Sequence, residues 1–164
     1  MNGGSLEIIH LFCIFAANIY LGKMTIYIGS DHAGYELKEL VKKHFEGQFK
    51  FADQGTFSSE SVDYPDFAHA VADRVLKDKD GVGILICGTG NGMAITANKH
   101  AGIRAALCWD PAISALAKQH NNANILVLPA RFISCEKAID TINSFFNAEF
   151  EGGRHQRRID KINL

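Results

Sequence analysis

The chain has 164 residues, and 17 Lys and Arg against 18 Asp and Glu give a formal net charge of −1. This balance excludes a protein that coats nucleic acid through a large basic surface. Apolar residues make up 47% and charged residues 21%, which is ordinary for a globular protein, and the length favours one domain. With three prolines and no tract rich in Ser or Gln, long disordered segments are not expected.

The cysteines stand at positions 13, 87, 108 and 135 and form no C-x-x-C pair. Four cysteines are too few for a disulfide scaffold in a chain of this length. We therefore expect a reducing, cytoplasmic compartment in which at most one thiol takes part in chemistry.

The first 23 residues differ from the rest. Residues 8–21 form an almost continuous apolar run, shorter than the roughly 20 residues that span a bilayer. Glu7 precedes the run, whereas a secretory signal needs positive charge there. Three interpretations stay open: a cleaved signal, a leader outside the core with Met24 as an alternative start, and an extra helix capped by Ser5. We expect residues 24–164 to form a single domain.

From Met24 onward, strand patterns and helix patterns alternate. Short apolar runs predict strands at 25–29, 49–51, 82–87, 103–108 and 125–128. Apolar residues at helical spacing predict helices around 37–45, 67–75, 93–99, 111–117 and 139–146. Strands joined by helices of this length form right-handed crossovers, so the sequence predicts an α/β protein whose parallel sheet is covered by helices on both faces.

Ligands of such sheets bind at the carboxyl ends of strands, near the point where the strand order reverses. If the first strand lies between the second and the third, that point falls between the first and third strands. The segments to consider are therefore Ser30–Gly34 and Cys87–Gly92, which directly follow these strands.

The second of these segments reads Cys-Gly-Thr-Gly-Asn-Gly. Its three glycines let the backbone approach a ligand and turn its N–H groups inward, which makes an anion pocket beside a helix start. The alternative is a glycine-rich turn that serves only tight packing. The segment lacks the Lys-Ser/Thr of a P-loop and is not G-x-G-x-x-G. Asp110, about 20 residues on, leaves a weak dinucleotide interpretation.

Cys87 ends a buried apolar strand, so it is either an inert core cysteine or a nucleophile or general base. In the second case the loop N–H groups and the next helix would stabilise its thiolate. Asp31 and His32 are adjacent and offer a metal pair, a helix cap or a catalytic pair. No further cluster of His, Cys and carboxylate residues is visible in the sequence, so no metal is expected.

The C-terminal segment holds a basic run from Arg154 to Arg158. On a helix these two arginines share a face, and two guanidinium groups suit a phosphate dianion. The alternative is a solvated run of charge that ends a helix. His120 closes an earlier helix, where a histidine suits the negative helix end.

Taken together, six motifs resemble those of the ribose-5-phosphate isomerase type B family, in its order and spacing, from Met24 to Leu164: SDHAG, DYPDFA, ICGTGNG, ANKHAGIRAA, HNNAN and EGGRHQRR. The resemblance implies a cofactor-free aldose–ketose isomerase that interconverts D-ribose 5-phosphate and D-ribulose 5-phosphate through ring opening and an enediolate. It places the enzyme in the non-oxidative pentose phosphate pathway. It also implies a three-layer α/β/α, Rossmann-like fold with five strands in the order 2-1-3-5-4, and a dimer or dimer of dimers with shared active sites.

The resemblance also implies the roles of single residues. Cys87 is the base that moves a proton between C2 and C1, and His120, with Thr89 nearby, opens the sugar ring. The implied substrate ligands are Asp31, His32, Tyr64, Gly88, Gly90, Asn91, Gly92 and Asn121. The implied phosphate ligands are His32, Arg131, Arg154 and Arg158. The residues expected to reach in from the partner subunit are His120, Asn121 and Arg131.

One branch of the family has serine in place of the cysteine and a glutamate base directly after the loop. Because Met93 stands there in this chain, the cysteine-base branch is expected. Related isomerases of allose 6-phosphate or galactose 6-phosphate share much of the framework, so a six-carbon phosphosugar remains an alternative substrate. A non-catalytic phosphate- or nucleotide-binding module is a second alternative, and a cysteine hydrolase is a third.

Overall fold

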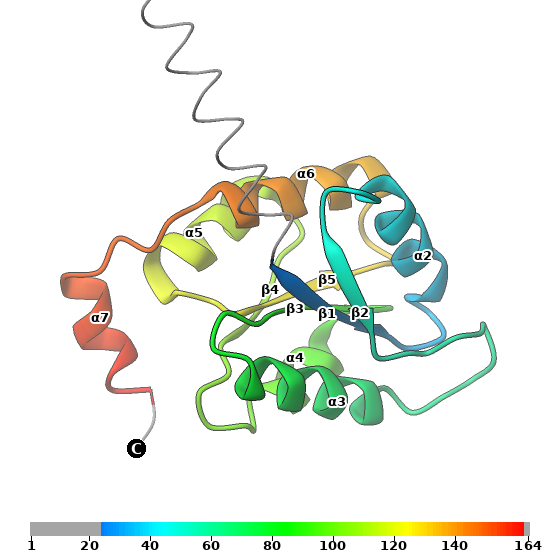
Figure 1. Cartoon of the computed structure of the whole chain (residues 1–164), viewed down its shortest axis with the longest axis horizontal. Coiled ribbons are helices and arrows are strands. Elements are labelled where there is room, and N and C mark those ends of the chain that lie inside the picture. The colour runs from blue at the N-terminus through cyan, green and yellow to red at the C-terminus, as the bar shows by residue number, and fades with distance from the viewer. Residues whose placement is uncertain (1–23, 163–164) are drawn as a thin grey trace, which may run out of the picture.

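A parallel sheet of five strands forms the middle layer of the structure, a computed structural model that describes residues 24–162 (Figure 1). The strands are β1 (Thr25–Ser30), β2 (Lys50–Asp53), β3 (Val82–Cys87), β4 (Ala105–Leu107) and β5 (Ile125–Pro129). Their order is β2-β1-β3-β5-β4 and every neighbouring pair is parallel, which confirms the predicted topology. The expectations for residues 1–23 lie outside the described residues.

Helices cover both faces of this sheet (Figure 1). One face carries α2 (Tyr35–His44), α5 (Pro111–Asn121) and α6 (Cys135–Asn147), and the other carries α3 (Tyr64–Lys77) and α4 (Asn91–Ala97). A short helix, α7 (Arg154–Ile159), lies beyond the end of α5. Within residues 24–162, none of the helices has the length and hydropathy needed to cross a membrane.

The core forms because β3 and β5 are buried along their whole length, as their continuous apolar sequences predicted. Ile84 and Leu126 pack with α2, α5 and α6, whereas Leu85 and Val127 pack with α3 and α4. Each fully buried aliphatic side chain of this kind stabilises the fold by about 1.5–3 kcal/mol relative to its exposed state. The sheet is therefore a rigid base for the loops at its edges.

Several element boundaries differ from the prediction by one to four residues, and three of the differences have a clear cause. Helix α4 begins at Asn91 rather than Met93, because its first turn is polar and carries no apolar signal. Strand β4 has only three residues, and the Asn98 side chain bonds both the N–H and the C=O of Ala105 at its outer edge. Strand β2 begins one residue later than predicted, because Phe49 stacks on Phe45 at 4.9 Å instead of joining the sheet.

A buried lysine braces the segment between β2 and α3. Lys38 is fully buried, and its Nζ donates at 2.7 Å to the Asp53 carboxylate and to the carbonyl oxygen of Thr56. Burial by itself raises the pKa of Asp53, but hydrogen bonds from Lys38 and Lys42 outweigh it and hold that pKa below its usual value. The carboxylate therefore stays charged and fixes this segment beside the carboxyl end of β1.

Candidate active site

The loop after β3 allows glycine alone at two positions. Gly90 has φ +77°, and a Cβ on it would lie 2.4 Å from Cδ1 of Leu107. A Cβ on Gly92 would lie 2.6 Å from the Tyr64 ring. Tight packing therefore explains both glycines. Because these positions lack a side chain, the loop backbone is also free to approach a ligand closely.

Asp31 lies beside this loop, at the end of β1. Its side chain is buried, its N–H donates to the carbonyl oxygen of Ile86, and its Oδ1 accepts a hydrogen bond of 2.9 Å from the N–H of Gly34. A Cβ on Gly34 would lie 2.3 Å from the oxygen of Ile86, so the two loops touch through backbone. Asp31 thus caps the turn before α2, and its carboxylate is close enough to the Cys87 thiol to raise the pKa of that thiol.

The net effect on that thiol differs from the expectation. The pKa of Cys87 is raised above its usual value, first by burial and then by the hydrogen bond and the negative charge of Asp31. The N–H groups of Gly90 and Thr89 lower the pKa, as expected, but they are outweighed. The loop N–H groups therefore act in the predicted direction, but burial and then the Asp31 carboxylate raise the pKa of Cys87 overall, and the sequence showed neither effect.

A cavity of about 360 Å³ opens next to the glycine loop. Its lining residues are Thr89, Asn91, Leu107, Trp109, Pro129 and Phe132. Trp109 and Phe132 are more than half exposed, so the rim presents aromatic surface. The volume is within the range of small-molecule sites, and Thr89 and Asn91 supply polar groups for a ligand.

Three more of the expected residues lie at this end of the sheet. His32 accepts a hydrogen bond at Nδ1 from the N–H of Val62, and Tyr64 starts α3 with its ring against Gly92. The Arg131 side chain lies about 3.4 Å from where a Cβ of Gly88 would be. Arg131 was expected to come from a partner subunit. In the structure it lies on its own chain's loop, because the segment after β5 runs beside the segment after β3.

The other expected residues lie at the opposite end of the sheet. His120 and Asn121 end α5, directly before β5 begins at Ile125. Cys87, at the end of β3, pairs with Pro129, which is the last residue of β5. Four steps of about 3.3 Å along β5 separate these ends by roughly 13 Å. Within one described chain, the structure therefore does not bring His120 and Asn121 to the Cys87 loop.

The turn after α5 explains the motif HNNAN. Asn122 has φ +44° and ends the helix in the left-handed conformation that asparagine tolerates. Arg104 donates to the carbonyl oxygens of Asn121 and Asn122 at 3.0 and 2.9 Å, and Asn124 accepts from the N–H of Arg104 at 2.8 Å. These bonds fix the end of α5 and hence the place of the His120 side chain.

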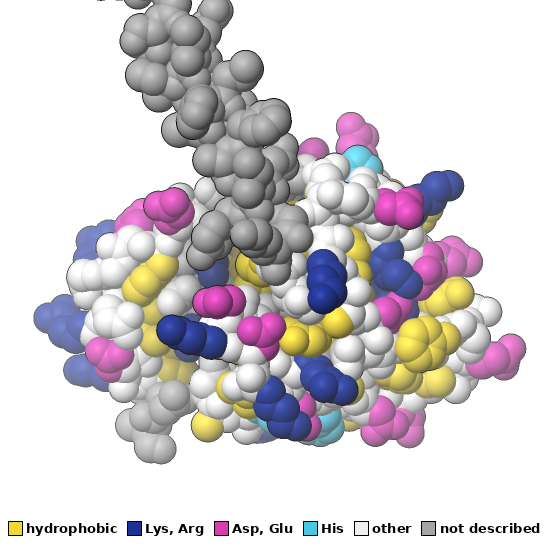
Figure 2. All heavy atoms as spheres, in the orientation of Figure 1, with side chains coloured by type: hydrophobic (Ala, Val, Ile, Leu, Met, Phe, Trp, Pro, Cys, Tyr) yellow, Lys and Arg dark blue, Asp and Glu magenta, His cyan; other side chains and the backbone are white. Residues whose placement is uncertain are grey.

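Helix α7 brings its basic residues to this same end. Arg154 and Arg158 are one helical turn apart, as predicted, and both are exposed. Lys and Arg side chains gather over α7 in the space-filling view, whereas elsewhere on that face acidic and basic side chains are interspersed (Figure 2). The basic run is therefore a local positive surface next to His120 and not part of a wide basic field.

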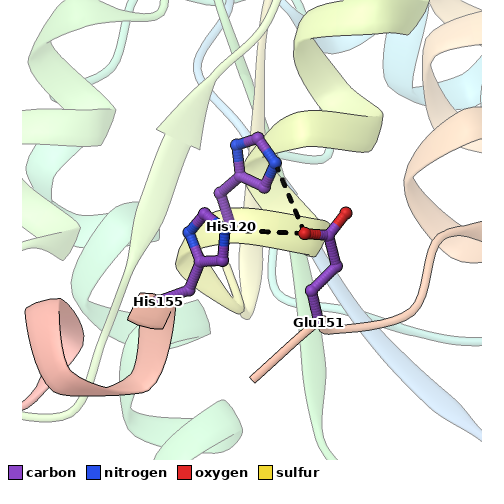
Figure 3. A group of neighbouring side chains, drawn as sticks. All are labelled: His120, Glu151 and His155. Carbon is purple, nitrogen blue, oxygen red and sulfur yellow. Dashed lines mark ion pairs between the residues drawn. The ribbon is translucent and has the colours of Figure 1, made fainter. Parts of the chain in front are cut away.

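Sequence reasoning missed a cluster beside His120. The ring of His155 stacks on the ring of His120, with 4.3 Å between centroids and 7° between planes, and Glu151 faces both rings (Figure 3). One ligand atom of each residue lies within 4.8 Å of the others, so the three side chains could hold a metal ion. A metal in the plane of one ring would lie outside the plane of the parallel ring, so one imidazole would first have to rotate. The expectation that no His and carboxylate residues cluster overlooked this group, because the turn at Gly152 and Gly153 that forms it has no apolar pattern.

Comparison with known proteins gives the family. The family model described as Ribose/Galactose Isomerase matches residues 26–162. "Ribose-5-phosphate isomerase B" of Escherichia coli is 44% identical over 138 residues, which cover 84% of this chain and 93% of that protein. "Probable ribose-5-phosphate isomerase B" of Mycoplasma genitalium is 49% identical over 140 residues, covering 84% and 92%.

Solved structures agree with this match. The ribose 5-phosphate isomerase of Thermotoga maritima has a TM-score of 0.83 and 52% identity, covering 85% of this chain and 97% of that one. The Mycoplasma genitalium enzyme with bound ribulose 5-phosphate has a TM-score of 0.82 and 48% identity, covering 85% and 94%. The chain therefore belongs to the ribose/galactose isomerase family. Within it, the chain groups with the type B ribose-5-phosphate isomerases, as its six motifs predicted, and the cysteine-base branch stays a prediction.

Proposed function

We propose that the chain is an aldose–ketose isomerase that interconverts D-ribose 5-phosphate and D-ribulose 5-phosphate. The observation that carries the proposal is the Cys87 thiol, which lies beside the Asp31 carboxylate at the start of a glycine loop, at the point where the strand order reverses. A relative that is 48% identical carries ribulose 5-phosphate in its solved structure, which supports this choice of substrate.

The reaction moves protons and needs no external oxidant. Ring opening takes a proton from O1 and gives one to the ring oxygen, and His120 is the residue proposed for this step. Cys87 then removes the proton from C2, a proton moves from O2 to O1 of the resulting enediolate, and the Cys87 thiol returns its proton to C1 to give the ketose. N–H groups of residues 88–92 are the proposed donors to the enediolate oxygen, the position at which preorganised donors lower the barrier most.

Cys87 must lose its own proton before it acts as a base. The Asp31 carboxylate is the charged neighbour that raises the pKa of the thiol, so it is the group proposed to accept that proton first. Asp31 is also a proposed ligand of a sugar hydroxyl. Binding of substrate would then redirect the carboxylate from the sulfur toward the sugar, and the loop N–H groups would favour the thiolate.

We further propose that each active site is shared by two chains. Cys87 and His120 lie at opposite ends of β5, so one site needs the Cys87 loop of one chain and the α5 end of another. Because α7 lies against that end, Arg154 and Arg158 would enter together with His120. Arg131 would act from the chain that supplies Cys87. A dimer is the smallest assembly that meets these requirements.

Mixing two inactive variants tests both proposals. Cys87→Ala and His120→Asn should each abolish conversion of ribose 5-phosphate. After unfolding and refolding together, half of the dimers are mixed and each has one intact site, so about a quarter of wild-type activity should return. No recovery, with mixed dimers shown by mass spectrometry of differently tagged chains, would place both residues in one chain's site or refute their roles.

The alternatives make different predictions for the same proteins. A phosphate-binding module would bind ribose 5-phosphate without converting it, and a six-carbon isomerase would convert allose 6-phosphate or galactose 6-phosphate faster. A cysteine hydrolase would cleave an ester and leave both pentose phosphates unchanged. A cytoplasmic location and a place in the pentose phosphate pathway are inferred from the cysteine content and the resemblance, and they stay predictions.

A further inference from the structure

The cluster of His120, Glu151 and His155 has no assigned role beyond that of His120. Its three members come from the end of α5, the segment before α7 and α7 itself (Figure 3). His155 is 6% exposed at its side chain and His120 36%, so a buried ring lies beneath a more open one. This arrangement leaves the His120 ring accessible to a ligand while covering one of its faces.

His155 is suited to be an uncharged platform. Its Nε2 accepts a hydrogen bond of 3.3 Å from Nε of Arg154. Burial is the largest effect that lowers the pKa of His155, and the positive charges of His120 and Arg154 lower it further. The plane of the His155 ring lies 7° from that of the His120 ring. A neutral His155 therefore supports the His120 ring without repelling a proton on His120.

Glu151 is held where it can orient His120. Its N–H donates to the carbonyl oxygen of Gln119 at 3.0 Å, which ties the segment to the last turn of α5. Its Oε2 lies 3.8 Å from Nε2 of His120. The Nε2 of His155, 3.5 Å from the same oxygen, already accepts from Arg154 and has no proton to offer. The N–H that Glu151 can pair with is therefore that of His120.

The turn between Glu151 and His155 lets both side chains contact His120. Gly152 and Gly153 have φ +65° and +53°, which reverses the chain within two residues. The N–H of His155 donates to the carbonyl oxygen of Gly152 at 2.9 Å and closes the turn. Because of this reversal, Glu151 lies at the edge of the His120 ring and His155 lies against the face of the same ring.

We propose that Glu151 and His155 are positioning residues for ring opening: the Glu151 carboxylate holds the Nε2 edge of His120, and the His155 ring fixes its plane. The proposal rests on the ring-opening role proposed for His120. It predicts that both residues matter for a cyclic substrate and not for the proton transfer at carbon.

Two substrates separate these steps. D-Ribose 5-phosphate closes a furanose ring, whereas D-ribulose 5-phosphate cannot, because its carbonyl is at C2 and its O5 carries the phosphate. Exchange of the C1 hydrogen of ribulose 5-phosphate in D₂O, followed by NMR, therefore reports proton transfer without ring opening. Conversion of ribose 5-phosphate reports both steps.

Glu151→Ala, Glu151→Gln and His155→Ala should each lower kcat for ribose 5-phosphate by roughly tenfold to a hundredfold, the usual cost of losing a residue that orients a catalytic group. C1 exchange should stay within about twofold of wild type for each variant. His155→Phe keeps a flat ring beneath His120 and should restore most of the activity lost in His155→Ala. Glu151 is half exposed, so its replacement should not unfold the chain.

A second histidine pair supplies the control. Nδ1 of His69 and Nε2 of His100 lie 2.7 Å apart, on α3 and directly after α4, which cover the face of the sheet opposite to α5, and His100→Asn should change neither readout. Equal losses of conversion and exchange in the Glu151 and His155 variants, unchanged conversion, or no rescue by phenylalanine would overturn the proposal. A wild-type protein that neither converts ribose 5-phosphate nor exchanges C1 would instead refute the proposed function itself.

Discussion

The Asp31 carboxylate lies beside the Cys87 thiol where β1 and β3 end side by side. Burial raises the pKa of the thiol most, and the negative charge of Asp31 raises it further, so both favour the protonated thiol. The base proposed for the reaction is thus kept inactive by a residue that is also proposed to bind the sugar. Thiolate formation would then depend on substrate.

Asp31→Asn tests this relationship. Removing the charge should lower the pKa of Cys87, so more thiolate is present at a given pH and iodoacetamide should alkylate Cys87 about three to ten times faster near pH 8. The measurement needs a background in which Cys13 and Cys135 are serine. Cys108 does not interfere, because it is fully buried and burial raises its pKa to about 12. An unchanged rate would show that burial alone sets the thiol pKa.

The arginines of α7 should act on the phosphate. Arg154→Ala and Arg158→Ala should each weaken kcat/KM by roughly 1.5–3 kcal/mol, the scale of a hydrogen bond to a charged group. The loss should be smaller for D-ribose, which lacks the phosphate. Arg157, on the same helix, gives the matched control as Arg157→Ala. Equal losses with and without the phosphate would assign the two arginines to structure.

Catalysis should not depend on a metal ion. Proton transfer through an enediolate can be stabilised by N–H donors alone, so incubation with EDTA followed by gel filtration should leave the rate of ribose 5-phosphate conversion unchanged. The His120, Glu151 and His155 cluster makes the measurement informative, since its ligand atoms are close enough to bind an ion. Loss of activity that an added divalent metal restores would contradict the prediction.

The fold was predictable because its signals are local and repeated. Continuous apolar runs gave β3 and β5, and helical spacing gave the helices between strands. The strand order followed from the motif resemblance, whereas the glycine loop followed from its place after the third strand. The boundaries that were predicted wrongly had no local signal. The first turn of α4 is polar, and β4 has only three residues because the Asn98 side chain bonds its outer edge.

The sequence predicted which segments follow the strands at this edge of the sheet, but not the electrostatics between them. Asp31 and Cys87 are far apart in the sequence, so no pattern showed that one would raise the pKa of the other. Glu151 and His155 escaped for the same reason, because only the turn at Gly152 and Gly153 brings them to His120. Contacts between distant segments decide such properties, and periodicity does not report them.

Residues 1–23 should be dispensable for activity. The family model matches residues 26–162, and the first strand of the sheet, β1, starts at Thr25. A chain beginning at Met24 should therefore be soluble, should form the same dimer in analytical ultracentrifugation and should convert ribose 5-phosphate at the rate of the full chain. An insoluble or inactive product would show that residues 1–23 belong to the domain.

Cys87→Ser is the most direct test of the base. Serine keeps the shape of the side chain, but its hydroxyl ionises far above neutral pH and cannot take the C2 proton. Solvent exchange at C2 should be abolished, while the affinity for ribose 5-phosphate, measured by calorimetry, should stay within about threefold, because the phosphate and hydroxyl ligands are untouched.

Two companion measurements separate the base from the ring opener. Iodoacetamide should inactivate the wild-type enzyme at Cys87, and substrate should protect it, whereas Cys135→Ser, at the start of α6 and outside the site, should behave like wild type. His120→Ala should lose conversion of the cyclic sugar but keep C1 exchange on ribulose 5-phosphate, since that step needs only the base. If Cys87→Ser isomerises ribose 5-phosphate at nearly the wild-type rate, the base is another group, and the proximity of Asp31 to Cys87 has no catalytic role.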